Sequence, residues 1–88
     1  MARTLTGPQA PDSQAVLLLK RSGGPSLLRL ADLAGVSDAS VSRGLAGLQP
    51  LDARIVGVLR VLLGPERAER IAAQAEVSRY DRLREQAS

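Results

Sequence analysis

Apolar residues recur along this 88-residue chain at the spacing of helices, and residues that start or stop helices separate the apolar stretches. The pattern predicts a first helix that is capped by Asp12 or Ser13 and stopped by Gly23-Gly24. A second helix is expected over 26–34, with a serine as its N-cap. A third helix is expected over 38–46, and a loop follows it.

The second half of the chain predicts one further helix and a helical tail. One helical stripe contains the apolar residues Leu51, Ile55, Val58, Leu59 and Leu62. Gly64-Pro65 ends that helix and starts another, because proline suits a first helical position. The apolar stripe of the last segment loses phase before Tyr80 and Leu83, so Ser78 followed by Asp81 can cap a separate short helix. The predicted fold class is all-α: a compact bundle of four to five short helices.

The same pattern divides the chain into three parts. Residues 1–11 contain glycine and proline and few apolar side chains, so we expect a flexible N-terminal arm. Arg3 in this arm can reach a DNA minor groove, although a disordered tail is the favoured interpretation. Residues 12–77 form the expected compact domain. Residues 78–88 form a C-terminal helical tail that serves dimerisation or the binding of a partner.

Composition excludes several kinds of chemistry. The chain has no cysteine and no histidine, which removes disulfides, thiol catalysis, thiolate metal sites and the commonest general base. Neither a glycine-rich phosphate loop nor paired carboxylates replace them, so we expect no enzyme, no metal and no cofactor. Tyr80 is the single aromatic residue. A core of Leu, Val, Ile and Ala suits close-packed helices better than a sheet.

The charge favours a polyanionic partner. Twelve basic and nine acidic residues give a net charge of +3, and the isoelectric point is near 10.6. All basic residues except Lys20 are arginine, which binds guanine edges and phosphates bidentately, although a GC-rich genome gives the same bias. No apolar run approaches the roughly 20 residues of a membrane span, and the N-terminus lacks a signal peptide's apolar segment. We therefore expect a cytoplasmic, nucleoid-associated protein.

Residues 27–46 carry the spacing that a helix-turn-helix DNA reader requires. Ala31 is small where two helices would cross, and Gly35 permits a sharp turn between them through a positive φ. Val36 and Val41 are expected to face the first helix and to fix the crossing angle. An ordinary helical hairpin also has small residues where its two helices cross, but it does not require all of these residue types together at this spacing.

The stretch LADLAGVSDASVSRGLAG resembles the Cro/cI-type (lambda-repressor-like, XRE-type) DNA-binding domains, and it is also similar to the headpiece of LacI-type repressors. The resemblance covers about 13–64. It implies that 12–77 is a helix-turn-helix DNA-binding domain and that its helix at 38–46 enters the major groove. The base-reading positions that it implies are Asp38, Ala39, Ser42 and Arg43. The phosphate-binding positions are Ser26, Ser37 and Ser40. Arg43 is the best candidate for a bidentate contact with guanine, and contact with phosphate alone is the alternative.

Two residues depart from the pattern of that family. Gly44 stands where a large apolar residue usually faces the core. It can shorten the recognition helix, leave a gap or let a neighbouring helix approach closely. Asp38 brings a negative charge near the DNA. Stabilisation of the helix N-terminus is the favoured interpretation. A hydrogen bond from cytosine N4 and a weakening of non-specific binding are the alternatives.

These observations predict a sequence-specific regulator of transcription, a repressor, that binds a double-stranded DNA operator as a homodimer. The expected dimer surface contains Val58, Leu62, Ile71, Tyr80 and Leu83. For Val58 and Leu62, a place in the core of the same chain is the favoured interpretation. The alternative function is that of a helix-turn-helix antitoxin, or of a phage or plasmid interaction protein, whose tail binds a protein partner. An apolar stripe in the tail without a mate inside the domain favours a partner.

Overall fold

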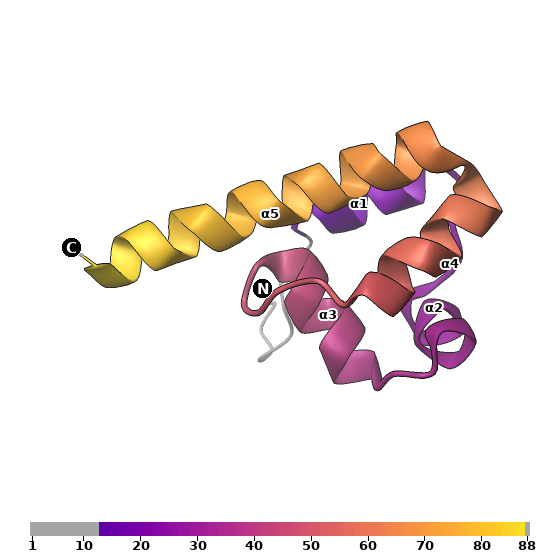
Figure 1. The fold of residues 1–88 in the computed structure, drawn as a ribbon, viewed down its shortest axis with the longest axis horizontal. Helices are drawn as coiled ribbons and strands as arrows, with labels where there is room; N and C mark the ends of the chain where they lie inside the picture. The colour runs from indigo at the N-terminus through magenta and orange to yellow at the C-terminus, as the bar shows by residue number, and fades with distance from the viewer. Residues whose placement is uncertain (1–12, 88) are drawn as a thin grey trace, which may run out of the picture.

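The computed structural model describes residues 13–87, and within them the chain forms five α-helices and no strand (Figure 1). The helices are α1 (Gln14–Arg21), α2 (Leu27–Ala34), α3 (Asp38–Ala46), α4 (Ala53–Leu63) and α5 (Pro65–Ala87). The prediction of an all-α bundle is confirmed. The predicted arm 1–11, with Arg3, and the candidate cap Asp12 lie outside the described residues.

Serine side chains start the first three helices. The Oγ atoms of Ser13, Ser26 and Ser37 each accept a hydrogen bond from the backbone N–H three residues later, at 3.1–3.2 Å. Each bond satisfies one of the amide groups that a helix N-terminus leaves without an intrahelical partner. Two of these three helices end at glycines in the left-handed conformation, Gly35 after α2 and Gly47 after α3. The short helices were predictable because these signals are local.

One hydrophobic core joins all five helices. α5 packs along α1 and α4, α2 packs on α3 and α4, and the end of α3 meets α5 (Figure 1). The largest fully buried side chains come from every helix: Leu19, Leu30, Val41, Leu45, Ile55, Leu59 and Ile71. No polar or charged residue is buried among the described residues. Apolar burial therefore holds α2 and α3 against the rest of the bundle.

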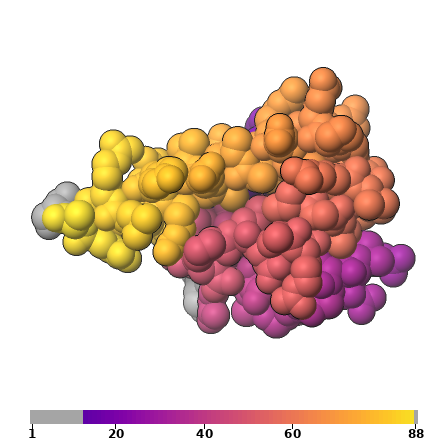
Figure 2. Space-filling view, in the orientation of Figure 1, coloured from indigo at the N-terminus to yellow at the C-terminus, as the bar shows by residue number. Residues whose placement is uncertain are grey.

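α5 corrects one prediction, because the chain does not break at Ser78. Pro65–Ala87 is a single helix of 23 residues, and no separate helix is capped at Ser78. The turn after Val77 stays helical because it packs against the end of α3. Arg79 Nη1 donates to the Leu48 carbonyl at 3.0 Å, and Arg82 Nε donates to the Ala46 carbonyl at 2.8 Å. Beyond this contact, the last turns of α5 project from the body, as Figure 2 shows.

Candidate nucleic-acid interface

The turn between α2 and α3 has the geometry that the sequence predicted. Gly35 adopts φ 71° and ψ 33°, and the N–H of Val36 donates to the Ala31 carbonyl at 3.0 Å. This left-handed turn closes the end of α2 and redirects the chain within three residues. Ala31 and Val41 are buried where the two helices meet, whereas Val36 is half-buried beside the core. The contact fixes the angle at which α3 leaves the body.

The four predicted base-reading residues lie on the outer side of α3. Asp38, Ala39 and Arg43 are exposed and Ser42 is half-buried. Val41 and Leu45, on the other side of the helix, are completely buried. The outer side offers a carboxylate, a hydroxyl and a guanidinium, which are the groups that distinguish base edges in a major groove. Its last turn is covered, because Ala46 is buried where α5 meets the helix.

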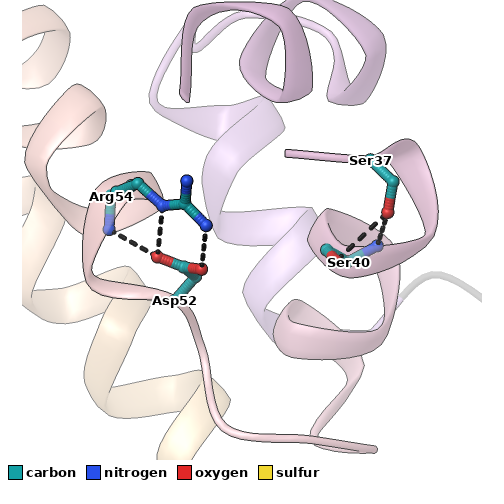
Figure 3. A network of polar contacts seen from close by, with 4 residues as sticks. All are labelled: Ser37, Ser40, Asp52 and Arg54. Carbon is teal, nitrogen blue, oxygen red and sulfur yellow. Dashed lines mark hydrogen bonds and ion pairs between the residues drawn. The ribbon is translucent and has the colours of Figure 1, made fainter. Parts of the chain in front are cut away.

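The predicted phosphate-binding serines already form hydrogen bonds within the chain. Ser37 Oγ accepts from the N–H of Ser40 and donates to Ser40 Oγ, both at 3.1 Å (Figure 3). Ser26 Oγ accepts from the N–H of Arg29 at the start of α2. Both capping residues are exposed. Ser26 and Ser37 therefore each order a helix N-terminus, and helix N-termini favour an anion.

The structure also shows an ion pair that sequence reasoning missed, at the start of α4. Asp52 accepts hydrogen bonds from the N–H and the guanidinium of Arg54, at 2.8–3.3 Å (Figure 3). The side-chain bond from Arg54 lowers the pKa of Asp52, and the same pair raises the pKa of Arg54. In the sequence, the available signal for this pair is an aspartate that stands two residues before an arginine at the start of a helix. The pair fixes an exposed guanidinium beside the N-terminus of α4.

Gly44 permits a close approach by a loop residue and not by a helix. A Cβ added at Gly44 would lie 2.8 Å from Leu51 Cδ1 and 3.3 Å from Leu51 Cα. The loop after α3 therefore packs on the glycine where a large side chain was expected. α3 spans Asp38–Ala46, as predicted, so of the effects considered for Gly44 the shortening of the helix does not occur.

The residues of the predicted dimer surface differ in how far they are exposed in the structure. Ile71 is 1% exposed inside the core of its own chain, so it is not available to a second copy. Val58 is half-buried against the same core, as favoured from the sequence. Leu62 is 48% exposed, so the interpretation of Leu62 as a core residue is wrong. Tyr80 and Leu83 are exposed on the outer part of α5.

Two other kinds of site are not found in the described part of the chain. No helix within residues 13–87 is both long enough and apolar enough to cross a membrane. Over the same residues, no group of three acidic side chains gathers as metal ligands would. Compared with known proteins, the chain matches no family model, no curated protein and no solved structure.

Proposed function

We propose that this protein is a sequence-specific regulator of transcription, a repressor, that binds double-stranded DNA as a homodimer through α3. The observation that carries the proposal is the outer side of α3, where Asp38, Ala39, Ser42 and Arg43 lie together on a helix held rigidly from behind. A helix presented in this way fits the major groove of B-DNA, which is wide enough to admit it.

The capped helix starts support the same proposal. The N-termini of α2 and α3 are exposed, and Ser26 and Ser37 order them. Backbone amides at helix N-termini bind phosphates and set the position of a protein on the duplex. Arg29, exposed in the first turn of α2, adds positive charge beside one of these ends. We propose that these groups contact the backbone while the outer side of α3 reads the bases.

Selection of bound sequences from random duplex DNA tests the proposal directly. We expect a defined consensus, and we expect Arg43→Ala to weaken binding to that consensus by about ten- to hundredfold, because a bidentate guanine contact is lost. Circular dichroism of the variant should be unchanged, because Arg43 is exposed. Selection that yields no consensus would contradict the proposal.

Arg67→Ala provides a control matched in charge. Arg67 is exposed in the first turn of α5, and its removal lowers the net charge by the same amount as removal of Arg43. Affinity of Arg67→Ala for the consensus should stay close to that of the parent protein. Equal losses in the two variants would mean that Arg43 acts only through its charge, as a contact with phosphate does.

A further inference from the structure

α5 carries a second, exposed apolar stripe beside the side that is buried in its own bundle. Ala68, Ile71 and Ala75 on one side of the helix are buried in the core. Outside that buried side, Val77 is 51% exposed, Tyr80 59% and Leu83 41%. These three residues are spaced by three along the helix, so they form one continuous surface. An apolar stripe on a projecting helix marks a surface that a partner covers.

A shallow groove of about 640 Å³ runs beside this stripe. Tyr80 and Leu83 form one wall of the groove, and Leu51 and Val56 lie on the side of the loop and α4. A helix laid along the stripe would therefore touch α5 and the apolar residues across the groove at the same time. The stripe and the groove together therefore offer one helix a continuous binding surface.

We propose that the occupant is α5 of a second copy of this chain, packed antiparallel about a two-fold axis at Tyr80. In that arrangement, a residue that lies n positions before Tyr80 in one copy is opposite the residue that lies n positions after Tyr80 in the second copy. Val77 then meets Leu83, three positions on either side, and Ala73 meets Ala87, seven positions on either side. The apolar residues of the stripe thus cover one another.

The charges of the stripe fit the same register. Glu76 and Arg84 lie four positions before and after Tyr80, so each Glu76 meets Arg84 of the second copy, twice in the dimer. Both residues are exposed on the side of Tyr80. In its own chain, Arg84 Nη2 is 2.7 Å from Asp81 Oδ1. Glu76 of the second copy would therefore be a second acidic neighbour of Arg84. A parallel pairing would place Glu76 against Glu76 and would be disfavoured by repulsion.

The expected dimer is modest in size. The stripe from Ala73 to Ala87 spans fourteen residue steps, or about 21 Å of helix. Such a contact is smaller than a standard protein interface, so the dimer should dissociate on dilution. The pairing rests on residues of α5 and of the groove beside it, and no residue of α3 takes part. Only its link to paired operator half-sites rests on the proposed DNA-binding function.

Sedimentation velocity of the full-length protein without DNA, over a concentration series, tests the pairing. The parent protein should pass from monomer to dimer, and Tyr80→Glu should remain monomeric because two carboxylates meet at the axis. Val61→Glu is the matched control, since Val61 is 83% exposed in another apolar groove on α4. This control should dimerise like the parent. A parent protein that is monomeric throughout, or a Val61→Glu variant that loses the dimer while Tyr80→Glu keeps it, would overturn the proposal.

Charge reversal tests the register. Glu76→Arg and Arg84→Glu should each weaken self-association by about tenfold, because like charges then meet twice. An equimolar mixture of the two variants should dimerise again, since both positions are basic in one variant and acidic in the other. Circular dichroism checks that each variant is folded. A mixture that associates no better than its components would overturn the antiparallel register, and DNA binding plays no part in the measurement.

Discussion

Gly35 and Gly47 both end helices in the left-handed conformation, with φ of 71° and 83°. Their surroundings differ. A Cβ at Gly35 would meet nothing within 4 Å, whereas a Cβ at Gly47 would lie 2.6 Å from the backbone carbonyl carbon of Ser78. At Gly47 the missing side chain therefore serves two purposes, because it permits the turn and lets α5 lie directly against the end of α3.

Substitution of both glycines by alanine should separate these two effects. Gly35→Ala should cost about 1–2 kcal/mol, the penalty of a left-handed conformation for a residue with a Cβ. Gly47→Ala should cost about 2–5 kcal/mol, because α5 must also move away from α3. Urea unfolding followed by circular dichroism measures both. Equal losses would mean that the contact between Gly47 and Ser78 does not constrain the fold.

The pair of Asp52 and Arg54 predicts how stability changes in acid. The hydrogen bond from Arg54 holds the pKa of Asp52 below its ordinary value of 3.8 in the folded protein. The pair therefore stabilises the fold fully above that ordinary pKa, and the stabilisation is lost as the pH falls through the lowered value. Asp52→Asn keeps a capping side chain but removes this titration. Its stability should fall less steeply in acid than that of the parent protein.

Thermal unfolding across the acid range measures this difference. Arg54→Ala should flatten the acid side less than Asp52→Asn does, because it removes the side-chain hydrogen bond that lowers the pKa of Asp52 most but keeps the bond from the backbone N–H. The chain has no histidine, so its side chains contribute little pH dependence between about pH 6 and 8. Profiles of the two variants that run parallel to that of the parent would contradict the assignment.

At the scale of the helices, the first three were predictable because their limits are set by neighbouring residues. The start of α4 was not, because the predicted stripe included Leu51, whereas Asp52 caps the helix and α4 begins at Ala53. Ser13, Ser26 and Ser37 cap helices in the structure as the sequence indicated, and Gly35 turns the chain. The continuity of α5 was not predictable in this way. Ser78 reads as a cap in isolation, but the turn that contains it is held by carbonyls of Ala46 and Leu48, more than thirty positions earlier.

The candidate site was predictable to the same extent. Val41, expected to face the first helix, identified the buried side of α3 and hence its outer side, and Leu45 is buried on that same side. The partner of Gly44 was not predictable, because it is a loop residue, Leu51, whose position depends on the packing of the following chain. The pairing of Asp52 with Arg54 also depends on side-chain conformation, which a pattern of residue types does not specify.

Arg82 should contribute to the stability of the whole bundle and not only to the C-terminal segment. Its half-buried side chain donates from Nε to the Ala46 carbonyl, one of the carbonyls at the end of α3. Arg82→Ala removes a charge-assisted hydrogen bond, so we expect a loss of about 1–3 kcal/mol in urea unfolding. Arg70→Ala, at an exposed position of the same helix, is the control and should change stability little. A loss confined to fraying of the last turns would indicate an independent tail.

At the scale of the molecule, the proposed DNA-binding and pairing surfaces do not compete for the same residues. α3 meets α5 through Ala46 and Gly47 at its C-terminal end, and Asp38 lies at the opposite end of the helix. The pairing stripe consists of residues of α5 from Ala73 onwards. Pairing through this stripe therefore uses none of the proposed base-reading residues of the two α3 helices. One two-fold axis would relate these helices, so the DNA they bind together should be an inverted repeat.

The sequence preference of Tyr80→Glu tests the connection between the two surfaces. The parent protein should select an inverted repeat, with half-sites separated by about one helical turn (roughly 34 Å) or a multiple of it. Tyr80→Glu should select the same half-site without its symmetric mate, because α3 is unchanged and only the pairing is lost. Arg43→Ala should lose the half-site preference while it still dimerises without DNA. If Tyr80→Glu selects the full repeat with undiminished affinity, the copies are not joined on DNA through α5, whether or not α3 reads the bases.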